Sequence, residues 1–327
     1  MTDTAEDTKP ASSFGAAEGG PLAQYGGDIP PAPGWFTRAV AAPYETGRVE
    51  VQGAGIEYQR WGKRGAPGLL LVHGNGAHSH WWDFIAPYFS GDYNVAALTF
   101  SGMGDSDWRE HYSMATFGAE QIAVAEEAGL FEGPVKPIII AHSFGGFVSI
   151  GTAARQGERF GGLIVVDSPI SPPERPHKGP DRSGRPNRVY ADLAAALGRF
   201  RLAPPQDCET HYAMDYIARW SLKKTDGGFT WKFDPSIWRH FHHDGEPSEL
   251  LKAAKCRLAM MRGEDSALVT DEVRDYAVKL LEGRVPYISI PHAYHHVLLD
   301  QPLAFIAALR ALLADWETSQ PVRLPCG

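Results

Sequence analysis

The sequence predicts an α/β fold with a mostly parallel sheet, and two observations support this prediction. Short runs rich in Leu, Ile and Val, such as residues 68–72, 137–141 and 163–166, have the length and composition of strands that are buried on both faces. Stretches of helical character, such as 114–129, alternate with these strands along the chain. This alternation places helices on both faces of the sheet and gathers ligands at the carboxyl ends of the strands.

Composition and charge indicate which kinds of binding partner are not expected for this protein. The chain has 327 residues, which is enough for one large α/β domain with an insertion or for two domains. Its net charge is −8 and it has no basic run. A nucleic-acid partner is therefore not expected, because phosphate binding needs clustered Lys and Arg. The cysteines, Cys208, Cys256 and Cys326, lie far apart and predict neither a disulfide framework nor a CxxC metal site.

The N-terminal region differs in character from the rest of the chain. Residues 1–45 are rich in Ala, Gly, Pro and Ser and lack apolar periodicity, so they predict a flexible tail, or an arm lying loosely on the surface, whose end Trp35 and Phe36 can anchor. The sequence begins without the basic and apolar pattern of a secretory signal, and no apolar run reaches the length of a membrane span. We therefore expect a cytoplasmic protein without a membrane partner.

Two glycine-rich loops follow strands in the first half of the chain. His73-Gly-Asn75-Gly76 follows the strand at 68–72, and Ser101-Gly-Met-Gly-Asp-Ser106 follows a strand at 95–100. Neither loop has the GxGxxG spacing of a dinucleotide site. The other elements predicted here are an antiparallel hairpin of residues 48–51 and 56–61, a short helix at 82–89 and the helix at 114–129.

The character of the chain changes between residues 170 and 249. Prolines break the opening stretch, helical patches follow near 188–200 and 209–223, and aromatic residues are dense. We predict an inserted, mostly helical cap at 170–249 on a core formed by residues 46–169 and 250–327. Most of the aromatic residues are expected to form the core of the cap itself. For the substrate pocket we select Trp82, Trp220 and Trp231.

The α/β pattern resumes after the predicted cap. A strand at 257–262 ends in Gly263-Glu-Asp-Ser266, and Thr270 begins a helix that extends to about residue 281. A last strand at 285–290 leads into a loop that contains three histidines. A final helix follows at 303–316, with Pro302 in its first turn.

One stretch joins a strand to a helix through small residues. Ala141 and Gly145 lie two positions before and two positions after Ser143, which is the spacing of a nucleophile elbow with Ala141 in place of the first glycine. Such a turn exposes the serine hydroxyl at a helix N-terminus, where unpaired N–H groups and the helix dipole favour a developing anion. The alternative interpretation is a buried serine at an ordinary turn.

A serine nucleophile needs a base within hydrogen-bond reach, and the base needs an acid that orients it. His295 fits the base, because it follows the last strand and precedes the final helix and so lies at the same sheet edge as Ser143. His292 and His296 are alternatives. We expect His296 to point elsewhere, because adjacent side chains diverge.

Four motifs in chain order resemble those of the α/β-hydrolase superfamily, over residues 45 to 320. They are the loops at 73–76 and 101–106, the turn at Ser143 and the histidine loop before Pro302. The resemblance implies an eight-stranded core with a lid, a Ser–acid–His triad and an oxyanion hole.

Carried over to this chain, the resemblance implies that Ser143 is the nucleophile and His295 the general base. It also implies that the backbone N–H groups of Asn75 and Phe144 form the oxyanion hole.

The acid departs from the commonest pattern of the family. The family usually places an Asp three residues after the glycine that ends the strand before the last, and Ser266 occupies that position here. Asp265 lies one residue early and is one alternative. Asp167, after the strand at 163–166, is the other, as in certain haloalkane dehalogenases, and it is the one we favour. An Asp there can also have a purely structural role.

The nucleophile decides the class of reaction. Dehalogenases and epoxide hydrolases of this fold use an Asp at that position, whereas Ser143 suits acyl transfer. Our main hypothesis is a serine hydrolase that cleaves an ester, thioester or lactone of an apolar or aromatic small molecule through an acyl-enzyme. One alternative is a carbon–carbon bond hydrolase, lyase or cofactor-free oxygenase on the same triad. The other is a non-catalytic binding protein on a hydrolase scaffold.

Other histidines cluster in two places, His78 with His80, and His240 with His242 and His243. No HExxH pattern accompanies them, so we expect no metal and no cofactor. We place His78 and His80 on the pocket wall or in the first helix. The expected partner is the small-molecule substrate, and a homodimer is an open alternative.

Overall fold

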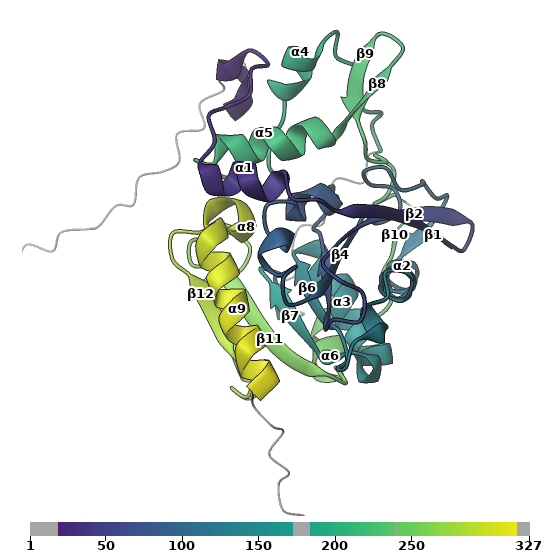
Figure 1. The fold of residues 1–327 in the computed structure, drawn as a ribbon, viewed down its shortest axis with the longest axis vertical. Helices are drawn as coiled ribbons and strands as arrows, with labels where there is room; N and C mark the ends of the chain where they lie inside the picture. Colours follow the sequence, from purple (N-terminus) through teal and green to yellow (C-terminus); the bar gives the residue numbers. More distant parts are fainter. Residues whose placement is uncertain (1–18, 173–183, 240, 319–327) are drawn as a thin grey trace, which may run out of the picture.

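The computed structural model describes residues 19–172, 184–239 and 241–318. At its centre lies an eight-stranded sheet in the order β1-β2-β4-β3-β6-β7-β11-β12 (Figure 1). The β1–β2 and β2–β4 pairs are antiparallel and the other pairs are parallel, which confirms the predicted sheet. The strands are β1 (Glu45–Val51), β2 (Ala54–Trp61), β3 (Gly68–Val72), β4 (Asn94–Leu98), β6 (Ile138–His142), β7 (Gly162–Val166), β11 (Arg257–Gly263) and β12 (Tyr287–Ile290).

Alternation along the central strands divides the core into two halves. In β3, Leu69 and Leu71 belong to one buried cluster, whereas Leu70 and Val72 belong to the other. Successive side chains of a strand point to opposite faces, so each cluster fills one face of the sheet. The helices α1 (Gly34–Val40) and α9 (Pro302–Thr318) cover one face, and α2 (Met114–Glu127) and α3 (Phe144–Gln156) cover the other (Figure 1).

The second half of the core contains three more helices. Thr270 caps α7 (Asp271–Leu280) as predicted, because its hydroxyl accepts the N–H of Val273 at 3.4 Å. The final predicted helix is α9, and a short helix, α8 (Val297–Asp300), precedes it. A further short helix, α6 (Pro247–Lys252), packs on α3.

The predicted helix at 82–89 is wrong in type. The structure has two 3₁₀ turns in this region, Ser79–Trp82 and Ala86–Tyr88. Pro87 lies in the second turn and has no N–H to donate, which prevents a continuous α-helix through this segment.

The described part of the predicted cap contains helices and strands. The helices α4 (Leu193–Leu197) and α5 (His211–Trp220) fall within the predicted helical patches. The hairpin of β8 (Leu222–Thr225) and β9 (Gly228–Trp231) was not predicted. Asp226-Gly227 at its turn is a recognised hairpin signal. A short strand, β10 (Phe241–His242), pairs with β5 (Tyr112–Ser113) of the core.

Residues 19–44 are folded against the predicted cap and the rest of the core, which differs from the flexible tail that the composition predicts. They include a 3₁₀ turn at Pro21–Tyr25 and the helix α1, and Leu22 and Phe36 are buried. The ring of Phe36 contacts Phe84 of the core, at 5.4 Å between ring centroids, and Tyr212 of α5, at 4.8 Å. Residues 1–18 of the predicted tail lie outside the described residues.

Among the described residues, no helix combines the length and the apolar character that a membrane crossing requires.

Because Phe36 is buried, we expect its side chain to contribute to the stability of the fold. We expect Phe36→Ala to lower the free energy of unfolding by about 3 kcal/mol, because it leaves a cavity between the core and the cap. Ile29 lies in the same segment but is 74 % exposed, so Ile29→Ala is a matched control with little expected effect. Urea unfolding of both variants measures the difference. Equal stability of F36A and I29A would show that the segment contributes no packing energy.

Candidate active site

Ser143 lies in the turn between β6 and α3 with a backbone that side chains rarely adopt. Its φ is 53° and its ψ is −120°. The surrounding structure holds it there: its N–H donates to the carbonyl of Val166 at 2.8 Å, and its carbonyl accepts from the Ser168 hydroxyl at 2.7 Å. A strained turn at the start of a helix is the geometry of a nucleophile elbow.

The two glycines after Ser143 are required by close packing. A Cβ at position 145 would lie 2.4 Å from the carbonyl oxygen of His73, and a Cβ at position 146 would lie 1.9 Å from the Ser168 hydroxyl. A larger residue at position 145 would require the backbone to move, and one at position 146 would displace the side chain of Ser168. The small residues that marked this turn in the sequence therefore let α3 start directly against the sheet.

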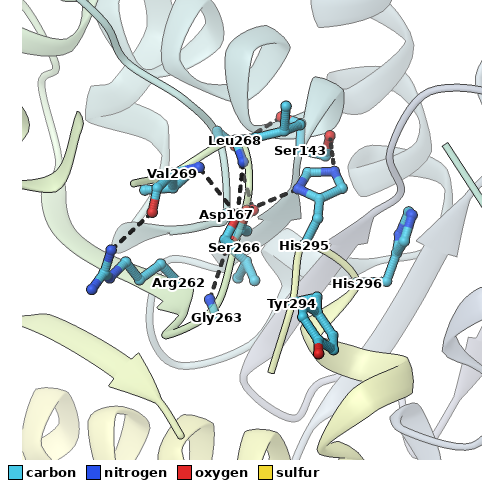
Figure 2. Close-up of polar contacts among 12 residues, drawn as sticks. Ser143, Asp167, Arg262, Gly263, Ser266, Leu268, Val269, Tyr294, His295 and His296 are labelled. Atoms are coloured by element: carbon cyan, nitrogen blue, oxygen red, sulfur yellow. Dashed lines mark hydrogen bonds and ion pairs between the residues drawn. The ribbon is translucent and has the colours of Figure 1, made fainter. Parts of the chain in front are cut away.

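His295 connects Ser143 to Asp167 (Figure 2). Its Nε2 lies 2.9 Å from the Ser143 Oγ, and its Nδ1 lies 2.8 Å from Oδ1 of Asp167. Because a carboxylate only accepts hydrogen bonds, Nδ1 carries the proton and Nε2 presents a lone pair to the serine hydroxyl. Ser143 is half-buried, whereas His295 and Asp167 are buried. This arrangement prepares the hydroxyl for proton removal.

Asp167 is buried with two further hydrogen-bond donors. The N–H of Gly263 donates to its Oδ2 at 2.7 Å, and the hydroxyl of Ser266 donates to its Oδ1 at 2.7 Å (Figure 2). Together with the N–H of His295, these donors satisfy a carboxylate that water cannot reach. The site therefore holds Asp167 as an acceptor for the imidazole.

The structure brings Asp167, and not Asp265, to the histidine. Asp265 is exposed, and its backbone N–H donates to the carbonyl of Ala293. Ser266, at the position where the family pattern has an acid, donates to Asp167 and accepts from the N–H groups of Leu268 and Val269. Ser266 was not predicted to belong to the site. A small hydroxyl residue in place of the usual acid is the signal that indicates it.

The alternative histidines take other positions. His292 is exposed, and its carbonyl accepts from the side chain of Gln301. His296 is buried beside His295, on the side away from Asp167 (Figure 2), and its ring lies 5.4 Å from that of Trp81 between centroids. Neither makes a hydrogen bond to Ser143 among the described residues. Of the three histidines in this loop, His295 is thus the one whose ring bonds to Ser143.

His142, just before the serine, supports the histidine loop. Its Nε2 donates to the carbonyl of His295 at 2.9 Å. Burial lowers the pKa of His142 to about 3, so its ring is neutral at pH 7 and carries one proton. This contact joins the loop after β12 directly to the turn after β6.

The loop after β3 lies against the elbow. A Cβ at Gly74 would lie 3.2 Å from the Cβ of Ser143, so the chain approaches closely here. His73 fixes the loop, because its Nδ1–H donates to the carbonyl of Gly74 at 2.7 Å and its Nε2 accepts from the N–H of Phe100 at 3.0 Å. Burial lowers the pKa of His73 to about 4, which keeps it neutral. Asn75, the next residue, is exposed beside the elbow.

Phe144 is the first residue of α3, and its N–H is one of the helix-start groups that have no intrahelical acceptor. Its side chain is buried among aromatic rings. Trp238 and Phe241 from the predicted cap lie 5.1 and 5.8 Å away between ring centroids. The residue next to the serine therefore contacts the cap.

The three tryptophans predicted for the pocket lie apart from one another. Trp82 is buried in the core and its ring approaches that of Phe305 of α9. Trp220, at the end of α5, stacks on His80 with 3.6 Å between ring centroids. Trp231, in β9, contacts the rings of Tyr190 and Phe200. Trp238, a tryptophan that was not selected for the pocket, lies beside Phe144 next to the elbow.

The cluster of His78 and His80 lies where the core meets the cap. His80 pairs with Asp83 at 2.7 Å, and the hydroxyl of Tyr216 in α5 donates to the same carboxylate at 2.6 Å. His78 bonds to the hydroxyl of Ser221 at 2.9 Å. These contacts connect the turn after the first glycine-rich loop to the cap.

The cap also crosses the second glycine-rich loop. The N–H of Asp234 donates to the carbonyl of Gly102 at 2.7 Å, and its carboxylate accepts from the hydroxyl of Tyr112 at 2.7 Å. Lys232 pairs with Asp105 at 2.5 Å.

The fold and site define an α/β hydrolase. A model of the Alpha/beta hydrolase family matches residues 69–309, and the chain belongs to this family. Esterase Rv0045c of Mycobacterium tuberculosis is 26 % identical over 276 residues, which cover 80 % of this chain and 88 % of the relative. The chain is thus an α/β hydrolase that is distantly similar to an esterase.

Solved structures share the fold. A crystal structure of the same esterase Rv0045c has a TM-score of 0.63 and 24 % identity, and covers 90 % of this chain and 95 % of that chain. A thioesterase domain from the curacin biosynthetic pathway has a TM-score of 0.67 and 22 % identity, and covers 84 % of this chain and 100 % of its own.

Asp300, at the end of α8, holds the histidine loop through hydrogen bonds to its carboxylate. Its carboxylate accepts from the N–H of Tyr294 at 2.8 Å and from the side-chain amide of Gln206 at 2.8 and 3.0 Å. The same Gln206 accepts from the N–H of His296 at 3.1 Å. Burial, and to a smaller extent the charge of Asp167, raise the pKa of Asp300 to about 7, although the hydrogen bonds oppose this rise.

The raised pKa of Asp300 predicts a pH-dependent stability. Between about pH 4, where the unfolded chain loses this proton, and about pH 7, the folded state keeps it, so stability falls as the pH rises. Asp300→Asn removes this dependence. We expect the stability of D300N relative to the wild type to increase from about pH 5 to about pH 8.

Urea midpoints at the two pH values measure this difference. Asp226→Asn, at an exposed hairpin turn, is the control and should show no such change. A constant difference between D300N and the wild type at both pH values would contradict the prediction.

Proposed function

We propose that the protein hydrolyses an ester, thioester or lactone through an acyl-enzyme on Ser143. The observation that carries this proposal is the continuous hydrogen-bonded chain from the Ser143 hydroxyl through His295 to the buried Asp167. The family membership and the similarity to a mycobacterial esterase support it.

The first half of the reaction forms the acyl-enzyme. The Oγ of Ser143 attacks the carbonyl carbon while Nε2 of His295 takes the hydroxyl proton, and Asp167 stabilises the resulting imidazolium. The carbonyl oxygen becomes an oxyanion, for which the N–H groups of Phe144 and Asn75 are the proposed donors. The bond to the leaving alcohol or thiol then breaks, and His295 returns the proton to the leaving group.

The second half repeats these steps with water. His295 takes a proton from a water molecule as the water oxygen attacks the acyl carbon, and the bond to Ser143 Oγ then breaks. His295 returns the proton to the serine, and the carboxylic acid leaves. No step requires a cofactor.

For the substrate we propose an apolar or aromatic small molecule. Phe144, beside the serine, is surrounded by Trp238 and Phe241 from the cap, so apolar side chains border the elbow on this side. Trp220 and Trp231 remain candidates for more distant parts of the pocket, and the buried position of Trp82 against Phe305 makes it a wall residue at most.

The role of Ser143 predicts loss of turnover on its removal. We expect Ser143→Ala to lower kcat for p-nitrophenyl esters by at least about 10⁴-fold, because within the described part of the chain Ser143 is the hydroxyl that bonds to Nε2 of His295. A fluorophosphonate probe should label the wild type at Ser143, as detected by mass spectrometry. Ser90→Ala, at a hydroxyl that bonds to the carbonyl of Pro87, is the control for labelling. Ester turnover retained by S143A would refute the proposal.

The role of Asp167 predicts a contrast between two acids. We expect Asp167→Asn to lower kcat by about 10⁴-fold, because an amide cannot hold His295 in the required tautomer. The matched control, Asp265→Asn, should stay within about twofold of the wild type, because this side chain is exposed. Steady-state kinetics of both variants decide between them. A larger loss in D265N than in D167N would transfer the acid role to Asp265.

A further inference from the structure

Gln206 lies in the predicted cap, between α4 and α5, and contacts the loop that carries His295. Its Oε1 accepts from the N–H of His296 at 3.1 Å. Its Nε2 donates to the carboxylate of Asp300, at 2.8 Å to Oδ1 and 3.0 Å to Oδ2. One half-buried amide thus connects the predicted cap to the histidine loop and to α8, and the proposed hydrolysis gives it no role.

The bond to His296 acts on the peptide unit that directly follows His295. The two polar groups of this unit are the carbonyl of His295 and the N–H of His296. The carbonyl accepts from Nε2 of His142 at 2.9 Å, and the N–H donates to Gln206. Because a peptide unit is planar, bonds at its two opposite sides fix its orientation. The Cα of His295 lies in that plane, so the same bonds fix the point from which the imidazole extends.

From this geometry we infer that Gln206 is a positioning residue through which the predicted cap orients the catalytic base. The imidazole of His295 must reach the Ser143 Oγ and Oδ1 of Asp167 at the same time, at 2.9 and 2.8 Å. A displacement of about 1 Å at a reacting group can lower the rate by about 10²-fold. The effect on turnover rests on the proposed function, whereas the effect on the hydrogen bond between His295 and Asp167 does not.

Asp300 determines which way the amide of Gln206 points. A carboxylate only accepts hydrogen bonds, so the NH₂ end of the amide faces Asp300 and its carbonyl end faces His296. The backbone N–H of Tyr294, just before His295, donates to the same carboxylate at 2.8 Å. Gln206 and Asp300 therefore hold the loop on both sides of His295.

Other residues of the same segment attach to the loop at different points. The carbonyl of Ala203 interacts with the ring of His296. The hydroxyl of Thr210 donates to the carbonyl of Leu299 at 2.8 Å. These contacts help to keep Gln206 in place, but they do not bond to the peptide unit after the catalytic histidine. Thr210 therefore offers a matched control.

Removal of the amide is the first test. We expect Gln206→Ala to lower kcat for a p-nitrophenyl ester by about tenfold, because His295 loses one of the bonds that orient it. Thr210→Val removes a bond between the same segment and α8, and it should stay within about twofold of the wild type. Near-UV circular dichroism checks that both variants are folded. A kcat of Q206A equal to that of the wild type would overturn the inference.

Gln206→Glu is a sharper test, because it replaces the amide and carboxylate by two carboxyl groups. Two carboxyl groups in hydrogen-bond contact share one proton, and the second of them ionises only at a raised pH. At about pH 6 the shared proton replaces the N–H of the amide, whereas at about pH 8.5 both groups are charged and repel each other. We expect the kcat of Q206E, divided by that of the wild type at the same pH, to fall by about fivefold or more between these values. A constant ratio contradicts the inference.

Two other titratable groups interact with Asp300, namely the carboxylate of Asp167 and the thiol of Cys208. Burial raises the pKa of Cys208 to about 11, so the thiol stays neutral in the assayed range. Burial raises the pKa of Asp300 to about 7, but the amide of Gln206 can donate to either form of this group in the wild type. Asp167 and His295 are present in both proteins, so division by the wild-type value removes their own titration.

Exchange of the donor and the acceptor should restore the bond. In the double variant Q206E/D300N, the amide at position 300 donates to the carboxylate at position 206, which still accepts from the N–H of His296. The carbonyl oxygen of that amide accepts from the N–H of Tyr294. Asp300→Asn alone lowers kcat, because it brings two NH₂ groups together. We expect the double variant to recover kcat to within about threefold of the wild type at both pH values. A folded double variant no more active than either single variant refutes the inference.

A measurement without substrate separates this inference from the proposed function. The Nδ1–H of His295, bonded to Asp167, should give a low-field proton resonance in the NMR spectrum, which Asp167→Asn should remove. We expect Q206A to shift this resonance and to speed its exchange with water, whereas T210V leaves it as in the wild type. An unchanged resonance in Q206A refutes the positioning role. A shifted resonance in a protein that hydrolyses no ester supports the positioning role and refutes only the proposed function.

Discussion

The buried carboxylate of Asp167 is the constraint on which the rest of the site depends. A charge without water must be compensated by donors, and here Gly263, Ser266 and His295 provide them. These donors come from the end of β11, from the loop that follows it and from the loop after β12. One carboxylate therefore sets the relative positions of three chain segments at the edge of the sheet.

The position of Ser143 depends on close packing more than on charge. The unusual backbone of the elbow is held by the carbonyl of Val166 and the hydroxyl of Ser168, both from the neighbouring strand β7 and its loop. Gly146 leaves room for the Ser168 hydroxyl, and Gly145 leaves room for the carbonyl of His73 on the other side of the turn. Asp167 lies between the two residues that hold the serine, so nucleophile and acid are positioned by the same short segment.

Local patterns explain why much of the fold was predictable. Continuous apolar strands and small residues around Ser143 are visible within a few positions, and the order of loops along the chain indicated His295. The sequence left the choice between Asp167 and Asp265 open, because both residues follow strands that end at the same edge of the sheet. The bonds of Ser266 to Asp167 and of Gln206 to His296 were missed because distant segments create them.

The fold of the N-terminal region was harder to predict than that of the sheet. Its composition lacks periodicity, and Leu22 belongs to no apolar repeat, although the adjacent Trp35 and Phe36 did indicate an anchor. The burial of Leu22 and Phe36 depends on partners from α5 and the core, which no local pattern reveals. The hairpin of β8 and β9 was missed for a different reason, because the dense aromatic residues there were interpreted as helical core.

The contacts that attach the predicted cap to the core affect how a ligand can reach the site. Phe36, Tyr216 and Tyr112 each bridge the two parts of the molecule, through ring packing or through a hydrogen bond to a carboxylate. A hinged opening would break all three attachments together. Passage past individual side chains breaks none of them. Ligand entry should therefore depend on the rotation of individual side chains between the predicted cap and the core.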